Sequence, residues 1–232
     1  MTGGDPSAVL AGDRSALARA GTAERVAQIL RQRIAEGVFL PGTRLAEPAI
    51  SSALGVSRNT LREAFQLLAH ERLAVRELNR GVFVRELTGP DIVDLYRIRR
   101  MVECAAVREA ADRDGLVLTA LVDALAEGKQ AALDEDWQAV GTASIRWHQA
   151  LSELSGSDRV AGTMRQVLAE TRLFFVLTEN TQAFFEPYLA RHEKIIGHLR
   201  RRRFDLAEQA LERYLRDAER QLLAAYHRRE TP

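Results

Sequence analysis

The spacing of apolar residues changes twice along this chain of 232 residues, and that change limits the possible folds. Over residues 22–38, apolar side chains recur every three or four positions, as on one face of an α-helix. Over residues 73–84 the spacing becomes two, as in strands with one buried face. After the Gly89-Pro90 break the helical spacing returns and continues towards the C-terminus. The pattern predicts a mainly α-helical chain with one small β-hairpin.

Composition excludes several classes of protein. No apolar run reaches the ~18 residues that a membrane span needs, and no basic segment followed by an apolar block marks a signal peptide. The single cysteine, Cys104, excludes an internal disulfide and every multi-cysteine zinc site. We therefore expect a cytoplasmic protein with no membrane partner. The net charge is only +1, but residues 21–87 hold ten Arg against seven Glu.

Breaks in the periodic pattern and changes in composition predict two domains and a tail. Residues 1–20 are rich in Gly, Ala and Ser without periodicity, which is typical of a mobile tail. We expect a first domain over 21–87, a linker over 88–90 and a second domain over 91–228. The second domain shows only helical signals and is expected to form an all-α bundle. Its six expected helices cover about 91–113, 116–131, 134–154, 158–178, 183–202 and 205–228.

The stretch GVSRNTLREAFQLL, residues 55–68, is the most informative part of the first domain. A short helix over 47–54 can end at Gly55, and Ser57 can cap the next helix. The hairpin follows, with its turn at residues 79–81. Two helices joined by a glycine-containing turn and followed by a hairpin predict a winged helix-turn-helix.

In such a unit the second helix presents its first turn to the major groove of double-stranded DNA. Arg58 at that position can donate to guanine O6 and N7, and Arg80 at the hairpin tip can reach a minor groove or a phosphate. Arg44 precedes the short helix and is a candidate phosphate contact. The candidate DNA-binding residues are Arg44, Ser57, Arg58, Asn59, Thr60, Arg62, Asn79, Arg80 and Gly81.

The first domain resembles the DNA-binding domain of GntR-family bacterial regulators. The resemblance lies in PGTRLAEPAISSALGVSRNTLREAFQLLAHERL followed by NRGVFV, where the PG-x-R-L, LGVSR, LREA and G-x-F-V elements occur in order. One position departs from the family: Pro48 stands where members such as the fatty-acid regulator FadR carry a DNA-contacting arginine. That contact is therefore not expected here.

The second domain is similar to the FCD domain, the ligand-binding domain of the FadR subfamily. DLYRIRRMVECAAVREAA resembles its first helix, and HEKIIGHL with the last long helix resembles its end. Six helices favour the smaller, VanR-like variant. The resemblance implies effector binding and dimerisation by this domain.

Polar residues recur on the apolar faces of four of these helices. They are Arg99 in the first, Ser144 and His148 in the third, His192 in the fifth and Tyr214 in the last. Buried polar groups need partners, so we expect these side chains to meet around a shared cavity.

The resemblance also implies a metal site, because many FCD domains bind a divalent metal through Asp-x-x-x-His and two later histidines. On this chain the pattern falls on Ser144, His148, His192 and Tyr214, so two ligands are kept. Serine and tyrosine are poor ligands for a divalent ion. Three readings stay open: an organic ligand bound directly, with Arg99 among its contacts; a weakly bound zinc, nickel or manganese ion on His148 and His192; or a closed core.

Together these features imply a homodimeric transcription regulator, a repressor, that binds operator DNA and responds to a small-molecule effector. The resemblance favours a carboxylate effector bound in the helical domain. Two alternatives remain: a constitutive DNA-binding dimer without a ligand, and a helical-domain enzyme with an accessory DNA-binding domain. No nucleophile–base pair, paired carboxylates or complete metal triad supports the enzyme, so no catalytic residue is expected.

Overall fold

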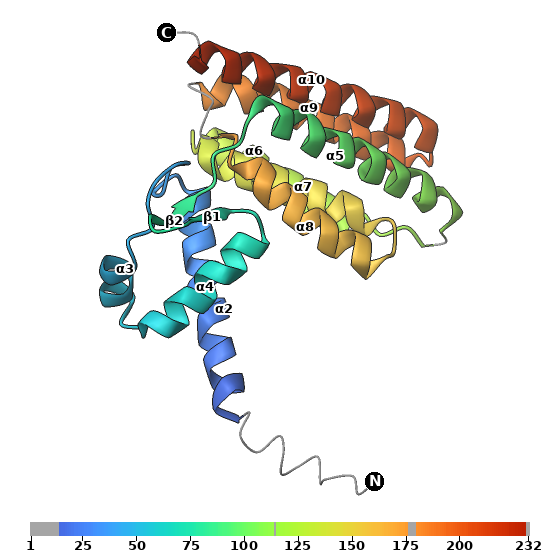
Figure 1. Ribbon diagram of the computed structural model, residues 1–232. Coiled ribbons are helices and arrows are strands. Elements are labelled where there is room, and N and C mark those ends of the chain that lie inside the picture. The colour runs from blue at the N-terminus through green and yellow to red at the C-terminus, as the bar shows by residue number, and fades with distance from the viewer. Residues whose placement is uncertain (1–13, 114, 176–179, 231–232) are drawn as a thin grey trace, which may run out of the picture. The chain divides into compact units, whose positions relative to one another are not determined.

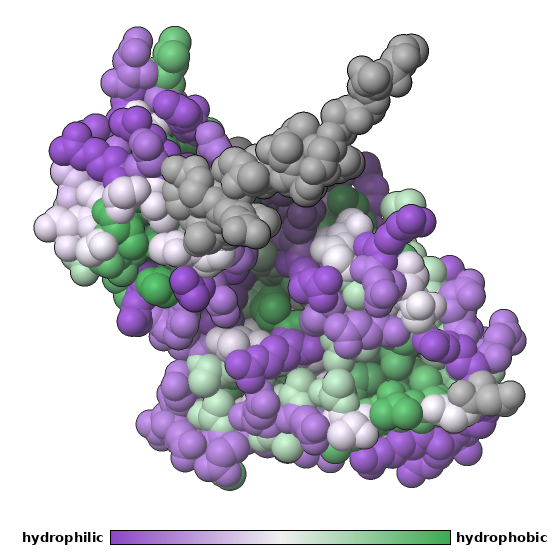
Figure 2. Space-filling view, turned by 90° about the horizontal axis from the view of Figure 1, so that it is seen from below, coloured by the Kyte–Doolittle hydropathy of each residue, from purple (hydrophilic) through white to green (hydrophobic). Residues whose placement is uncertain are grey.

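A computed structural model describes residues 14–113, 115–175 and 180–230, which belong to two compact units (Figure 1). Unit 1 is Met1–Glu86 and unit 2 is Leu87–Pro232. In the view of Figure 2, hydrophilic residues cover most of the surface and apolar residues form smaller patches. Across the described ranges, no helix is both long and apolar enough to cross a bilayer.

Unit 1 consists of three helices and a two-stranded antiparallel sheet among the described residues. The helices are α2 (Arg14–Ala35), α3 (Glu47–Leu54) and α4 (Arg58–His70), and the strands are β1 (Ala74–Glu77) and β2 (Gly81–Val84). Helices α2 and α4 pack against each other. Their buried apolar residues form the core, which includes Val26, Leu30, Ile34, Leu61, Ala64, Phe65 and Leu68.

The first helix differs from its predicted limits at both ends. It begins at Arg14, so residues 14–20, predicted to belong to the tail, are helical, while residues 1–13 lie outside the described part of the chain. It ends at Ala35, because Gly37 adopts a positive φ of 73°. Val38, predicted on the buried face of this helix, is therefore 60% exposed.

The turn between α3 and α4 has the predicted chemistry. Gly55 closes α3 in the left-handed conformation, at φ 63° and ψ 32°. The Ser57 side chain accepts a hydrogen bond of 3.1 Å from the Thr60 amide and so caps α4. The helix-turn-helix and the wing predicted from the sequence are both present.

The wing pairs Ala74 with Val84 at its open end and Glu77 with Gly81 at its tip. Asn79 in the turn has a positive φ of 60°, a conformation that asparagine tolerates. The chain before α3 adds to this sheet, because Arg44 forms an antiparallel bridge with Phe83. Arg44 is thereby fixed beside the start of β2.

Unit 2 contains six α-helices among its described residues, as predicted. They are α5 (Gly89–Glu109), α6 (Thr119–Leu133), α7 (Trp137–Glu153), α8 (Asp158–Arg172), α9 (Thr181–Arg200) and α10 (Phe204–Glu230). A short 3-10 turn, Ala110–Asp112, follows α5. The predicted linker at 88–90 is wrong, because Thr88 caps α5 in a capping box with Asp91 and Gly89 already belongs to the helix.

Helix α7 lies at the centre of the bundle and contacts α5, α6, α8 and α9. Helix α10 packs against α5 and α9. Trp147 and Leu151 of α7 are fully buried. This arrangement brings one face of α5, α7, α9 and α10 towards a common centre.

Gly141 in α7 permits a close helix contact. A Cβ atom at this position would lie 2.8 Å from Cζ of Phe185 and 3.2 Å from Nη1 of Arg172. We expect Gly141→Ala to lower the free energy of unfolding by about 1–3 kcal/mol, as overpacking in a buried contact does. Urea unfolding followed by tryptophan fluorescence measures this.

Gly162 in α8 is the matched control, because a Cβ there would lie 3.7 Å from its nearest neighbour, a guanidinium nitrogen of Arg165. Gly162→Ala should raise stability by about 0.5–1 kcal/mol through helix propensity alone. Equal effects of the two substitutions would contradict the close contact at Gly141.

Candidate functional sites: an arginine pocket and a buried polar cluster

The first turn of α4 opens onto a pocket of about 560 Å³ in unit 1. Four arginines line it, together with residues of α3 and the wing. We call it the arginine pocket and define it by Arg44, Arg58, Arg62 and Arg76. Among the described residues, Glu47 is the only acidic one that lines it, so this lining has an excess of positive charge.

Local contacts position these guanidinium groups. Arg62 is 60% exposed and its Nε donates to Oε2 of Glu47 at 3.0 Å. Gly81 makes room for Arg44, because a Cβ at Gly81 would lie 3.3 Å from Nε of that arginine. Arg58 is exposed at the start of α4. Arg76 projects from β1 and is exposed; the sequence reading missed it, although its place in the two-residue alternation was a usable signal.

The other predicted DNA-binding residues fall into two groups. Asn59 is exposed in the first turn of α4, and Asn79 and Arg80 are exposed at the wing tip. Thr60 differs from the prediction: it is only 8% exposed and its hydroxyl pairs with that of Ser57 at 2.8 Å. Thr60 therefore supports the helix cap and does not face outward.

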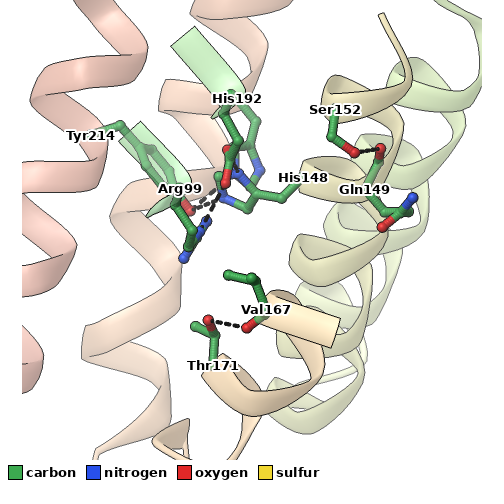
Figure 3. A network of polar contacts seen from close by, with 9 residues as sticks. Arg99, His148, Gln149, Ser152, Val167, Thr171, His192 and Tyr214 are labelled. Carbon is green, nitrogen blue, oxygen red and sulfur yellow. Dashed lines mark hydrogen bonds and ion pairs between the residues drawn. The ribbon is translucent and has the colours of Figure 1, made fainter. Parts of the chain in front are cut away.

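In unit 2 the structure buries all the polar residues predicted to point inward. They are Arg99 of α5, Ser144 and His148 of α7, His192 of α9 and Tyr214 of α10, and each is at most 7% exposed. Figure 3 shows four of them, Arg99, His148, His192 and Tyr214, directed towards one another. The Tyr214 hydroxyl lies 3.0 Å from Nε2 of His148 and 3.2 Å from Nε2 of His192. These residues, with Glu103, form what we call the polar cluster.

Glu103 is the member that the sequence reading missed. Its Oε2 lies 2.6 Å from Nδ1 of His148, and its Oε1 accepts from Nε of Arg99 at 2.8 Å. The side chain is fully buried. Its position four residues after Arg99, on the same helical face, was the available signal.

Burial and neighbouring charges set the protonation of the cluster. Burial alone raises the pKa of Glu103, but His148 and Arg99 outweigh it and lower the pKa, so the carboxylate is ionised. Burial lowers the pKa of His148 more than Glu103 raises it. Burial, together with His148 and the positive charge of Arg99, lowers the pKa of His192 well below 6.5. Both imidazoles are therefore neutral near pH 7.

Aromatic contacts enclose the cluster. Trp147 stacks on His192 with ring centroids 4.0 Å apart, and the Arg99 guanidinium lies 4.7 Å from the Tyr96 ring centroid. Among the described residues, Nη2 of Arg99 has no hydrogen-bond partner. The side chains of the cluster contact one another directly. Two pockets of unit 2, of about 650 and 590 Å³, are lined by other residues, around α6 and the end of α9.

The cluster does not fit a divalent metal. In the part of the chain that the structure describes, no three His, Cys, Asp or Glu side chains form a metal-binding group. The place where the two Nε2 atoms converge holds the Tyr214 oxygen, and the remaining nitrogen of His148 is engaged by Glu103.

A capped helix whose exposed first turn carries arginine beside a wing is the arrangement with which winged helix-turn-helix proteins bind DNA. Unit 1 therefore places the chain among DNA-binding transcription regulators. The chain belongs to the GntR family of bacterial regulatory proteins: that family matches residues 22–84, and the FCD domain matches residues 94–217. The family and fold class predicted from the sequence are confirmed.

Individual relatives agree with this assignment. A GntR transcriptional regulator of known crystal structure from Rhodococcus sp. RHA1 is 47% identical, with a TM-score of 0.83 over 88% of this chain and 98% of that one. The HTH-type regulator YdhC of Bacillus subtilis (strain 168) is 27% identical over 78% of this chain and 81% of its own.

The gluconate operon transcriptional repressor of Bacillus subtilis (strain 168) is 39% identical over 87 residues. That match covers 38% of this chain and 35% of the repressor, so the chain spans about a third of that relative's length.

The neutral histidines make the stability of unit 2 depend on pH. Below 6.5 an unfolded His192 takes up a proton that the folded one resists, so stability is full above 6.5 and falls as the pH decreases. We expect a loss of about 1.4 kcal/mol per pH unit for each such histidine. Urea unfolding between pH 7 and about pH 5 measures it, with Trp137 and Trp147, both in unit 2, as fluorescent probes.

His192→Gln should flatten this dependence. His70→Gln is the control, because His70 is exposed and lies in unit 1. An identical pH dependence in wild type and His192→Gln would show that the buried ring is not the group responsible.

Proposed function

We propose that this chain is a homodimeric repressor whose unit 1 binds a palindromic operator and whose unit 2 controls that binding through a small metabolite. The observation that carries the proposal is the arginine pocket beside the capped first turn of α4. Two copies would each bind one half-site. The name of the gluconate operon relative, which matches over part of the chain, supports repression.

Within unit 1 the arginines divide by position. Arg58, in the first turn of α4, is placed for a bidentate contact to guanine in the major groove. Arg44, Arg62 and Arg76 surround the same pocket and suit phosphate oxygens, since arginine binds phosphate through a planar fork. Pro48 also lines the pocket, so Arg44 and Arg76 supply the charge that this position lacks.

Within unit 2 the polar cluster is the proposed effector site. The effector would bind to its side chains directly, without a metal. Nη2 of Arg99 is a buried cationic donor with no partner among the described residues, and a carboxylate is the acceptor it would bind most strongly. Because the cluster is so deeply buried, binding requires the bundle to repack. The bound state would therefore differ in structure from the free one, as control of affinity requires.

The connection between the units suits such control. Helix α5 carries Arg99 and Glu103 and starts at Gly89, directly after its Thr88 cap. Only residues 85–87 separate that cap from the end of β2. We propose that a shift of α5 reaches the wing through this short segment.

The protein acts in the cytoplasm and catalyses no reaction in this proposal.

The DNA-binding assignment predicts two different losses. Arg58→Ala should lose about 1–3 kcal/mol of binding free energy on a duplex that the wild-type protein has selected from random sequence. The loss should be smaller on unselected DNA. Arg76→Ala should weaken binding to both duplexes equally. It should also reduce the slope of log affinity against log salt concentration by about one. Fluorescence anisotropy over a range of salt concentrations measures both.

Arg25→Ala is the matched control for these variants. Arg25 is exposed in α2, its guanidinium donates to the Thr22 hydroxyl, and it does not line the arginine pocket. If Arg58→Ala bound the selected duplex as tightly as Arg25→Ala does, α4 would not be the recognition helix.

The effector assignment is tested with a panel of sugar acids, dicarboxylic acids and fatty acids. We expect at least one to change operator affinity in wild type and to have no such effect on Arg99→Lys. That variant keeps the positive charge that Glu103 requires but has no Nη2. Assaying each acid for turnover in parallel separates the enzyme alternative. Operator affinity unmoved by the whole panel would favour the constitutive dimer.

A further inference from the structure

We propose that the Tyr214 hydroxyl occupies the position that a divalent metal holds in FCD domains, so that unit 2 is a metal-free bundle tied together by one phenol. The inference concerns the same cluster as the proposed effector site but does not depend on effector binding. It rests on three features of the cluster: its geometry, its hydrogen-bond direction and its charge.

The geometry places one oxygen at the meeting point of three helices. Tyr214 comes from α10, and its hydroxyl lies 3.0 Å from Nε2 of His148 on α7 and 3.2 Å from Nε2 of His192 on α9. Ser144 lies one turn before His148 on the same helix. The phenol therefore contacts both histidines of the expected metal pattern.

The phenol has one proton, so it donates to one of the two Nε2 atoms and must accept from the other. The ionised Glu103 can only accept, so Nδ1 of His148 carries the proton and donates across their 2.6 Å contact. Nε2 of the neutral His148 is then an acceptor and receives the Tyr214 proton. Because that proton is used, Nε2 of His192 must donate to the Tyr214 oxygen. Burial raises the pKa of Tyr214, which keeps the phenol protonated.

This chain of donors leaves no pair of nitrogen lone pairs directed at a common point. The Nε2 lone pair of His148 accepts the phenol proton, while Nε2 of His192 carries a hydrogen. A metal needs deprotonated ligands that converge. It would therefore have to displace the phenol and move the His192 proton to the other ring nitrogen.

Charge opposes a metal as well. Arg99 and Glu103 neutralise each other at 2.8 Å, and both are almost fully buried. Ser144 stands where the metal pattern has an aspartate, so the cluster lacks that compensating carboxylate. A divalent ion would bring two uncompensated positive charges into this site beside Arg99, which is strongly unfavourable in a buried environment.

The test measures metal content and thermal midpoint on the full-length, untagged protein. Wild type should hold far less than about one metal per protomer, and its midpoint should not move with chelator, Zn²⁺ or Ni²⁺. Tyr214→His should gain metal binding, because a third imidazole then replaces the phenol between His148 and His192. Adding Ser144→Asp should strengthen it, so that Zn²⁺ raises the midpoint of the double variant further.

Tyr214→Phe is the matched control. It removes only the hydroxyl, so its midpoint should drop and should not respond to metal. About one metal per protomer in wild type, lost in His148→Gln, would overturn the proposal. A folded Ser144→Asp/Tyr214→His double variant that gains no metal would also overturn it, since it has both the third imidazole and the carboxylate of the metal pattern.

If Tyr214→His does not fold, wild type and Tyr214→Phe decide the question. An unchanged midpoint in Tyr214→Phe would mean that the hydroxyl does not tie the helices together. None of these readings involves operator DNA or an effector, so a failure here is distinct from a failure of the proposed regulation.

Discussion

The buried ion pair between Arg99 and Glu103 is the interaction on which the centre of the helical unit depends. Both groups lie on α5, out of contact with water, where an unpaired charge would be strongly destabilising. Glu103 in turn fixes the tautomer of His148, and His148 fixes the direction in which the Tyr214 hydroxyl donates. The orientation of polar groups on α7, α9 and α10 thus follows from one carboxylate on α5.

The DNA-binding unit depends on a different constraint, the cap at Ser57. With Gly55 turning the chain and the Ser57 side chain accepting from the Thr60 amide, the helix can start abruptly. Its first turn can then carry Arg58 and Asn59 in solvent, while Leu61, Ala64 and Leu68 are fully buried on the other face. The same sequence stretch therefore serves packing and recognition without conflict.

Most of the fold was predictable because local signals were strong. Gly55, Ser57 and the alternation on either side of Gly81 determine their own backbone conformations, so the helix-turn-helix and wing were placed correctly. Glu103 and Arg76 were missed because their roles depend on residues distant in sequence, such as His148 and the pocket-lining arginines of other elements. Thr60 was misjudged although helical spacing offered a signal, because it lies four residues before Ala64 and eight before Leu68 on the buried face of α4.

The polar cluster also explains why residue identity alone could not separate the three readings of the expected metal pattern. Two histidines are compatible with a weak metal site, an organic-ligand site or a closed core. The distinction lies in what fills the space between them, and that depends on a phenol delivered by α10. A hydrogen-bonded centre with no net negative charge does not compensate the charge of a divalent ion. It can nevertheless open to a ligand that replaces the hydrogen bonds it breaks. Control of DNA binding by unit 2 without a metal is therefore physically consistent with this arrangement. The free-energy difference between the effector-free and effector-bound states would come from exchanged hydrogen bonds and repacked helices.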